Sequence, residues 1–270
     1  MKMIDIGVNL HHRDFTTDRD DVISRAIQAG IGTMIVTGTS LKESVAASQL
    51  AGKYPGVLYS TAGVHPHNAR QCGNDTIGVL RELASSAHVV AIGECGLDFN
   101  RDFSPRDQQE KRFEAQVELA CELGLPLFLH ERDAHERFLS ILNKHRDQIS
   151  EAVVHCFTGT ERELKAYLAM DLHIGITGWI CDDRRGAHLR ELVRMIPLER
   201  LMIETDAPFL IPRNMPIRPR SGRNEPAFLT FVLQVIARSI GSAEDKVAAA
   251  TTRTARAFFR LGVEQNQTDR

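Results

Sequence analysis

Short apolar segments rich in valine and isoleucine recur along this chain, separated by longer segments with helical periodicity. Each segment has the length and the β-branched composition of a buried strand. Strands that alternate with helices throughout a chain pair in parallel, because each helical crossover returns the chain to the same end of the sheet. The eight predicted strands are Met3 to Val8, Thr33 to Thr37, Leu58 to Ala62, Val89 to Gly93, Leu127 to Leu129, Ala152 to Val154, His173 to Ile176, and Leu201 to Ile203.

The segments between these strands carry signals for helix starts. Ser40, Ser104, Thr160 and Ser242 each stand three residues before a carboxylate, the pattern in which a hydroxyl caps a helix N-terminus. Pro105 occupies a favoured first helical position. A strand, a capped helix and the next strand therefore form the repeating unit.

Eight strand and helix units predict a single α/β domain, a (β/α)8 barrel of the TIM type, for which about 250 residues are typical. An open doubly wound sheet is the alternative, and it ordinarily carries a glycine-rich phosphate loop after its first strand. Residues 7–12 read Gly-Val-Asn-Leu-His-His and lack that pattern. We expect the barrel to occupy residues 1–263, followed by a frayed polar tail over residues 264–270.

Charge and cysteine content narrow the environments that suit this chain. The formal net charge of −2 provides no overall field for nucleic acid or membranes, so any such partner must bind a local patch. The five cysteines are far apart and form no Cys-x-x-Cys pair, which fits the reduced cytoplasm. The N-terminus lacks a signal-peptide pattern, and no apolar run reaches the roughly 18 residues of a membrane span. We therefore expect a cytoplasmic protein with no membrane partner.

Polar residues that suit metal binding follow several of the predicted strands. In a barrel the carboxyl ends of all strands meet at one mouth, where active sites lie. Imidazole and carboxylate groups are ligands that divalent metals use. A metal site at the mouth is thus predicted, with ordinary polar loop starts as the alternative. The candidate residues are His65 and His67 after the third strand, Glu94 after the fourth, His130 after the fifth, His155 after the sixth and Asp206 after the eighth.

The stretches around these residues resemble the signature blocks of the TatD family of metal-dependent deoxyribonucleases, and in particular the bacterial TatD subfamily. The resemblance covers nearly the whole chain in the family's order. It implies a TIM-type barrel of the metallo-dependent hydrolase superfamily that hydrolyses phosphodiesters with a divalent metal, usually magnesium. The blocks lie at residues 64–67, 91–98, 129–134, 154–159 and 203–208, and a further similar block, Arg-Asn-Glu-Pro, lies at residues 223–226.

The resemblance also implies a role for each candidate residue. Glu94, His130 and His155 match metal ligands, and Asp206 matches a carboxylate that binds a second metal or orients the nucleophilic water. His65 matches an active-site histidine that contacts the phosphate. We therefore expect Asp206, Glu94 and His65 to be catalytic. One or two Mg²⁺ ions are expected, and the ligand types are also compatible with Mn²⁺ or Zn²⁺.

One departure from the family pattern concerns the first strand. Many relatives begin with Asp-x-His-x-His, whereas this chain has Asp5, Gly7 and Asn9 at those positions. The side-chain carbonyl of Asn9 is a weaker ligand than an imidazole. A complete two-metal site is therefore in question, and the number of metal ions stays open.

Several residues near the mouth are candidates for substrate binding, namely Asn9, His67, Arg132, Trp179 and Arg223. Trp179 could stack on an unpaired base or simply cover the barrel rim. Arg132 could bind a phosphate or pair with a nearby carboxylate. Arg223 lies in an arginine-rich loop that is either a phosphate site or a solvated loop.

These residues favour a metal-dependent phosphodiester hydrolase. A 3′–5′ exonuclease on single-stranded DNA or RNA ends, serving DNA repair or nucleic-acid turnover, is the leading hypothesis. A metal-dependent ester or amide hydrolase, such as a deacylase of aminoacyl-tRNA, is the alternative, because the same metal chemistry hydrolyses carbonyl compounds. A non-catalytic binding protein with a structural metal is a third hypothesis. The resemblance points to a monomer.

Overall fold

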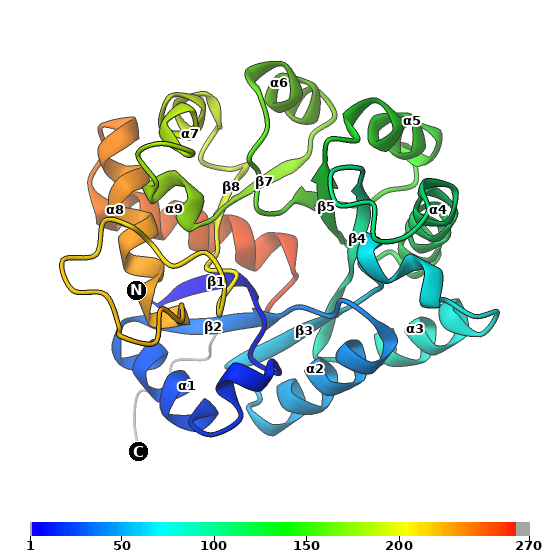
Figure 1. Cartoon of the computed structure of the whole chain (residues 1–270), viewed down its shortest axis with the longest axis horizontal. Helices are drawn as coiled ribbons and strands as arrows, with labels where there is room; N and C mark the ends of the chain where they lie inside the picture. Colours follow the sequence, from blue (N-terminus) through cyan, green and yellow to red (C-terminus); the bar gives the residue numbers. More distant parts are fainter. Residues whose placement is uncertain (1, 263–270) are drawn as a thin grey trace.

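The computed structural model describes residues 2–262. Within that range eight parallel strands pair in chain order, from β1 to β8, with helices on the outside (Figure 1). The predicted (β/α)8 barrel is therefore confirmed. The predicted tail and the domain boundary at residue 263 lie outside the described residues. The strands are β1 (Met3–Val8), β2 (Ile31–Val36), β3 (Leu58–Ala62), β4 (Val89–Asp98), β5 (Leu127–Arg132), β6 (Ala152–Val154), β7 (His173–Ile176) and β8 (Leu201–Ile203).

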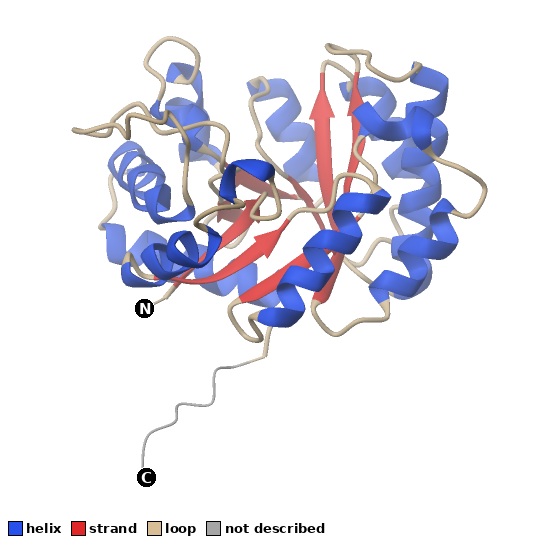
Figure 2. Cartoon of the chain, turned by 60° about the horizontal axis from the view of Figure 1, so that its bottom comes forward, coloured by secondary structure: helices blue, strands red, loops and turns tan. Residues whose placement is uncertain are grey.

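Helices surround the strands (Figure 2). The α-helices are α1 (Arg19–Gln28), α2 (Leu41–Lys53), α3 (Thr76–Ala84), α4 (Arg106–Leu123), α5 (His135–His145), α6 (Glu161–Ala169), α7 (Ala187–Leu192), α8 (Leu229–Ile240) and α9 (Glu244–Phe258). Short 3-10 helices are η1 (Arg13–Phe15), η2 (Pro66–Gln71), η3 (Gly178–Cys181), η4 (Val193–Met195) and η5 (Pro226–Phe228).

The barrel is closed at one end by apolar side chains. Residues near the strand starts, such as Ile4, Val90 and Val153, form a buried cluster with Phe258 and Phe259 from the end of α9. Burying a phenylalanine side chain stabilises a fold by about 1.5–3 kcal/mol relative to leaving it exposed. Helix α9 therefore seals the amino-terminal end of the barrel, and the carboxyl ends of the strands form the open end.

Backbone hydrogen bonds just beyond β8 join this strand to β1 and complete the barrel. The N–H of Asp206 donates to the carbonyl oxygen of Gly7 (2.8 Å), and the N–H of Asn9 donates to that of Ala207 (2.7 Å). The first and last strands thus meet at the mouth. Their closure sets Asn9 and Asp206 side by side.

Two strands extend further than the apolar pattern predicts. The predicted ends at Gly93 and Leu129 are too early, because β4 and β5 continue to Asp98 and Arg132. The extra residues pair with each other in parallel, Gly96 to Asp98 against the last residues of β5. A hydrophobicity criterion stops at the first charged side chain, whereas the ladder of backbone hydrogen bonds continues through it.

Two of the predicted helix caps are confirmed and two are wrong. Ser40 and Thr160 accept the expected N–H at the starts of α2 and α6. The caps predicted at Ser104 and Ser242 are absent, because α4 and α9 begin two residues after these serines. The Ser104 hydroxyl instead donates to the carbonyl oxygen of His67 (2.9 Å) and joins two loops at the mouth.

The cysteines are free thiols. All five lie in the described part of the chain, and none forms a disulfide there. Among the described residues, no single helix has the length and apolar character of a membrane span. The segments Pro226–Ile240 and Glu244–Phe258 satisfy the length and composition criteria only together, as a pair bent by 109°.

Gly96 is required where β4 and β5 approach most closely. Its φ is +148°, and a Cβ at this position would lie 1.8 Å from the carbonyl oxygen of His130. We expect Gly96→Ala to destabilise the fold by at least about 2 kcal/mol, which lowers the melting temperature by about 4–8 °C. Calorimetry measures this shift.

The control is Gly78→Ala on the exposed face of α3, where a Cβ meets nothing within 4 Å. Alanine should stabilise that helix by a few tenths of a kcal/mol, roughly. Equal melting temperatures for the two variants would contradict the argument.

Candidate active site

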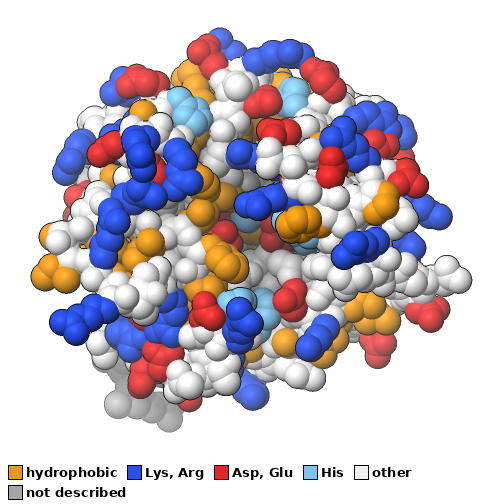
Figure 3. All heavy atoms as spheres, in the orientation of Figure 1, with side chains coloured by type: hydrophobic (Ala, Val, Ile, Leu, Met, Phe, Trp, Pro, Cys, Tyr) orange, Lys and Arg blue, Asp and Glu red, His pale blue; other side chains and the backbone are white. Residues whose placement is uncertain are grey.

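The open end of the barrel is hollowed at its centre. Histidine and acidic side chains lie at the floor of this hollow, and lysine and arginine side chains surround it (Figure 3). The residues predicted after β3, β4, β5 and β6 lie at this end of the barrel because the strands are parallel.

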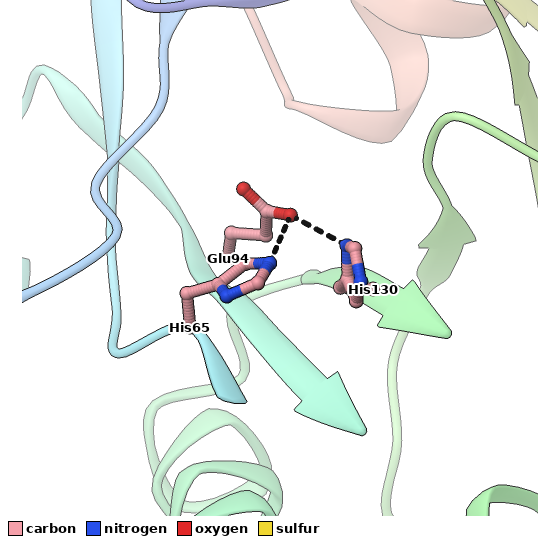
Figure 4. Close-up of side chains that lie close together, drawn as sticks. All are labelled: His65, Glu94 and His130. Atoms are coloured by element: carbon pink, nitrogen blue, oxygen red, sulfur yellow. Dashed lines mark hydrogen bonds and ion pairs between the residues drawn. The ribbon is translucent and has the colours of Figure 1, made fainter. Parts of the chain in front are cut away.

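Three imidazoles meet one carboxylate oxygen. Glu94 Oε1 lies 2.7 Å from His155 Nε2, 2.9 Å from His130 Nδ1 and 3.2 Å from His65 Nε2. These side chains come from four neighbouring parts of the barrel, namely β4, β5, the end of β6 and the loop after β3. Figure 4 shows Glu94 between His65 and His130. The strand order, and no local motif, brings them together.

This arrangement fits a divalent metal ion. His65, Glu94 and His130 each offer one ligand atom, and these atoms lie within 4.8 Å of one another. His130 Nε2 is buried and has no hydrogen-bond partner among the described residues. A buried polar atom without a partner is costly, and imidazole nitrogens with a carboxylate are a donor set that divalent metals accept. His155 shares the Glu94 oxygen and belongs to the same cluster.

The charges in the cluster depend on one another. Burial alone would raise the pKa of the Glu94 carboxyl, but the imidazoles of His155, His65 and His130 lower it well below its usual range. Burial alone would lower the pKa of His155, but the carboxylates of Glu94 and Glu204 raise it well above its usual range. Burial lowers the pKa of His65 to about 4, against the attraction of Glu94. His65 is therefore neutral at pH 7, whereas Glu94 is ionised.

The imidazoles of His155 and His65 differ in the partner that each Nδ1 faces. His155 Nδ1 lies 3.2 Å from Glu204 Oε2, so its proton is directed to that carboxylate. The raised pKa of His155 places a second proton on Nε2, directed to Glu94, and this is the proton that a bound metal ion would displace. His65 Nδ1 instead accepts the backbone N–H of His67 (3.1 Å). The proton of neutral His65 is then on Nε2, which makes this atom a donor. Glu204 thus fixes the Nδ1 proton of His155 and leaves Nε2 as the atom that would face a metal ion, whereas the backbone makes His65 Nε2 a hydrogen-bond donor.

Glu204 was not among the predicted site residues. Its carboxylate is fully buried, contacts His155, and accepts the backbone N–H of Cys156 (2.5 Å). The sequence gives the same signal for Glu204 as for Glu94, namely a carboxylate directly after an apolar strand. The family motif pointed to Asp206, two residues later, as the site carboxylate of the eighth strand. Two acidic residues after one strand cannot be ranked without knowing which one faces the barrel interior.

The absent first-strand histidine has a steric explanation. A Cβ at Gly7 would lie 2.4 Å from Glu204 Oε2 and 3.1 Å from the ring of Phe128. The Glu204 side chain occupies the space that a side chain at position 7 needs. In this chain, the buried position of Glu204 after β8 therefore requires a residue without a side chain at position 7 of β1.

Asp206 and Asn9 form the other side of the site. The Asn9 amide donates to Asp206 Oδ1 (3.1 Å), and both side chains lie at the junction of β1 and β8. Burial raises the pKa of Asp206 to about 7, against a lowering influence of His155. Asp206 has a φ of +53°, so the chain turns sharply after β8 and directs this carboxylate into the mouth.

Asp98 is a second site residue that the sequence analysis missed. Its Oδ2 lies 2.6 Å from His67 Nε2 and 3.7 Å from His130 Nε2. Burial alone would raise the pKa of Asp98, but these imidazoles lower it well below its usual range. His67, a predicted substrate contact, is thus held by a carboxylate beside the cluster. The extension of β4 to Asp98, which the apolar pattern did not indicate, carries this residue into the site.

Arg132 lines a cavity beside the cluster. The cavity has a volume of about 200 Å³ and is also lined by Thr158 from the loop after β6 and by His188 from α7. The Arg132 guanidinium donates to the Thr158 hydroxyl (2.8 Å) and is half exposed. The nearby carboxylate of Asp133 is 3.9 Å away. The guanidinium therefore keeps donors available for an anionic group.

Trp179 and Arg223 already interact with other side chains of the protein. The guanidinium of Arg185 lies 4.4 Å from the centroid of the Trp179 ring and covers one of its faces. Arg223 donates to Asp18 (2.7 Å) and Glu225 (2.7 Å). These carboxylates raise the pKa of Arg223 above its usual range. Substrate contacts by these two residues stay predictions, and each would compete with an existing interaction.

Comparisons with known proteins agree with the motifs. A model of the TatD related DNase family matches residues 4–260. A protein from Pantoea sp. (strain At-9b) named 3′–5′ ssDNA/RNA exonuclease TatD is 54% identical over 259 residues, which are 96% of this chain and 100% of that protein. The resemblance seen in the sequence is thereby confirmed.

Solved structures show the same architecture. A hydrolase TatD family protein from Entamoeba histolytica superposes with a TM-score of 0.87 at 25% identity, over 96% of this chain and 98% of that one. A TatD homologue from Escherichia coli k12 gives a TM-score of 0.86 at 27% identity, with the same coverage of both chains. The barrel and its order of elements are therefore common to these proteins.

The different Nδ1 partners of His155 and His65 predict unequal effects on metal binding. In calorimetric titrations of metal-free protein with Mn²⁺, we expect His155→Ala and Glu94→Gln to weaken binding by more than about tenfold. His65→Ala should stay within about threefold of the wild type. His145→Ala, on α5 beside Glu114, is the control for loss of an imidazole elsewhere. Loss of Mn²⁺ binding in His65→Ala would instead make His65 a ligand.

Glu204 should act by positioning His155. We expect Glu204→Gln to weaken Mn²⁺ binding by about 10- to 100-fold, because an amide holds the His155 tautomer less well. Nuclear magnetic resonance of the imidazole nitrogens reports the tautomer directly. Glu151→Gln is the matched control, since Glu151, the residue before β6, lies 3.5 Å from Nδ1 of His173 on β7. An unchanged His155 tautomer in Glu204→Gln would contradict this role.

Proposed function

The chain belongs to the TatD related DNase family, a family of hydrolases, and we propose that it is a 3′–5′ exonuclease that shortens single-stranded DNA and RNA. The observation that carries the proposal is the cluster around Glu94 at the barrel mouth. The 54% identity to a protein named for this activity covers nearly all of both chains. That match also favours a nuclease over the aminoacyl-tRNA deacylase.

Glu94, His130 and His155 are proposed to hold the metal ion, with Asp206 completing its surroundings. A bound divalent cation supplies charge neutralisation on phosphoryl oxygens and acidifies water. Mg²⁺ is the proposed ion, and the imidazoles also accept Mn²⁺ or Zn²⁺. The deep burial of Glu94 and His155 keeps both groups fixed before substrate arrives.

Asp206 is proposed to take the proton of the attacking water. Its Oδ1 accepts the Asn9 amide, which leaves Oδ2 to accept that proton. Asn9 in turn fixes the plane of the carboxylate. A base held this way contributes typically 10²- to 10⁴-fold to a rate.

Hydrogen-bond donors surround the place where the scissile phosphate would lie. His65 presents Nε2–H, and the Arg132 guanidinium faces the neighbouring cavity. His67 is oriented by Asp98. Charged hydrogen bonds to phosphate oxygens are short and strong, so Arg132 is proposed to bind the phosphate backbone.

The remaining parts of the proposal concern the setting of the enzyme. The enzyme is proposed to act as a monomer. Free cysteines support a reduced, cytoplasmic setting. DNA repair or nucleic-acid turnover would supply the single-stranded ends.

A time course with 5′-labelled single-stranded DNA and Mg²⁺ tests the activity. We expect a ladder that shortens from the 3′ end and disappears with chelator. Asp206→Asn should lower kcat by about 10²- to 10⁴-fold while DNA binding stays within a few-fold. Asp171→Asn, on the exposed turn before β7, is the matched control and should cleave as the wild type does.

An intact strand with every divalent metal tried would contradict the exonuclease proposal. Release of the amino acid from aminoacyl-tRNA by the same preparation would then support the deacylase. Cleavage that persists in Asp206→Asn would leave the exonuclease in place but remove Asp206 as the proton acceptor.

A further inference from the structure

Two phenylalanines in loops at the mouth are exposed to solvent. Phe103 is 53% and Phe209 is 49% exposed, and both are among the few large apolar side chains of the described residues that face solvent. Each forfeits part of the roughly 1.5–3 kcal/mol that burial of a phenylalanine contributes. Apolar side chains also flank the central hollow in Figure 3. Both rings belong to loops that follow strands of the site.

Phe103 is held rigidly beside the site. Its ring lies edge-to-face on His67, with centroids 4.7 Å apart, and His67 is bonded to Asp98. The next residue, Ser104, is fully buried and donates to the carbonyl oxygen of His67 (2.9 Å). Gln109 donates to the carbonyl oxygen of Ser104 (2.8 Å). The backbone that carries Phe103 is therefore anchored, and its ring stays exposed.

Phe209 is held in the same manner on another loop. Its backbone N–H donates to the carbonyl oxygen of Asp206 (3.0 Å), and its own carbonyl accepts the buried amide of Asn224 (2.6 Å). The ring lies edge-to-face on His12, with centroids 5.6 Å apart. Phe209 thus stands three residues after the proposed proton acceptor on an anchored turn.

The two rings lie on opposite sides of the mouth. Phe103 follows β4 and Phe209 follows β8, and these strands are half a circuit apart in the described strand order, which β1 and β8 close. A strand end that entered the mouth toward the cluster around Glu94 would have one ring on each side. Trp179, by contrast, has one face covered by Arg185.

We propose that Phe103 and Phe209 are base-stacking subsites that hold the unpaired nucleotides next to the scissile phosphate. This inference rests on the exonuclease function proposed above. Every nucleobase presents a π face, so stacking on an aromatic ring binds single strands with little sequence preference. A paired end cannot offer its bases to separate rings, so the two subsites select unpaired ends. Their ligand is single-stranded nucleic acid of either sugar type.

The test measures binding apart from cleavage. Fluorescence anisotropy of a 5′-labelled 12-nucleotide DNA strand in chelator reports affinity without turnover. We expect Phe103→Ala and Phe209→Ala each to weaken binding by about 5- to 100-fold. Ile27→Ala, which removes a 43% exposed apolar side chain from α1, is the matched control and should bind as the wild type does.

Further measurements distinguish base stacking from general apolar contact and from misfolding of the variants. Phe103→Trp should restore binding, whereas Phe103→Leu, which keeps an apolar side chain of similar size, should not. A DNA strand whose two 3′-terminal nucleotides lack bases should bind the wild type about as weakly as intact DNA binds the alanine variants. The alanine variants should bind this abasic strand almost as well as they bind intact DNA. Melting temperatures within about 2 °C of the wild type show that the variants are folded.

The outcomes separate this inference from the activity itself. If the wild type shortens DNA with Mg²⁺ but both alanine variants bind as Ile27→Ala does, the subsites are overturned and the exonuclease stands. Equal binding of Phe103→Leu and Phe103→Trp would overturn stacking as the cause. A wild type that neither binds nor shortens single strands would overturn both proposals.

Discussion

The contact of three imidazoles with a single oxygen of Glu94 is the interaction on which the site depends. A buried carboxylate is costly unless opposite charges or hydrogen-bond donors compensate for the lost water. Here the compensating groups come from β5, the end of β6 and the loop after β3. The register of four neighbouring strands must therefore be kept, and the close approach of Gly96 to His130 shows how tightly β4 and β5 are fitted.

The surroundings of each histidine decide its chemical role. His155 and His65 contact the same Glu94 oxygen, yet the Nδ1 of His155 donates to Glu204 and the Nδ1 of His65 accepts a backbone N–H. The carboxylate therefore holds one imidazole in the orientation of a metal ligand, and the backbone makes the other a hydrogen-bond donor. Burial of Glu204 over Gly7 also accounts for the absence of a first-strand histidine, because the two side chains would occupy the same volume.

Much of the barrel could be predicted because its signals are local. Alternation of apolar strands with helices indicated the fold, and the caps at Ser40 and Thr160 were read correctly. Errors arose where tertiary pairing overrides the local pattern. Strand β4 continues past Gly93 through charged residues, and Ser104 uses its hydroxyl to join two loops instead of capping a helix. Glu204 and Asp98 were missed because sequence position does not show which face of a strand a carboxylate occupies.

The sequence by itself determined the order of the elements, the family motifs and the set of polar residues at the strand ends, since hydrophobic periodicity and spacing are properties of neighbouring residues. Only the tertiary structure decided which of those residues share an oxygen, which partner each imidazole nitrogen faces, and which aromatic rings stay exposed at the mouth. These depend on strand register and barrel closure, which bring together residues as distant in sequence as Asn9 and Asp206. Distances of a few ångströms between such residues are set by packing of the whole barrel.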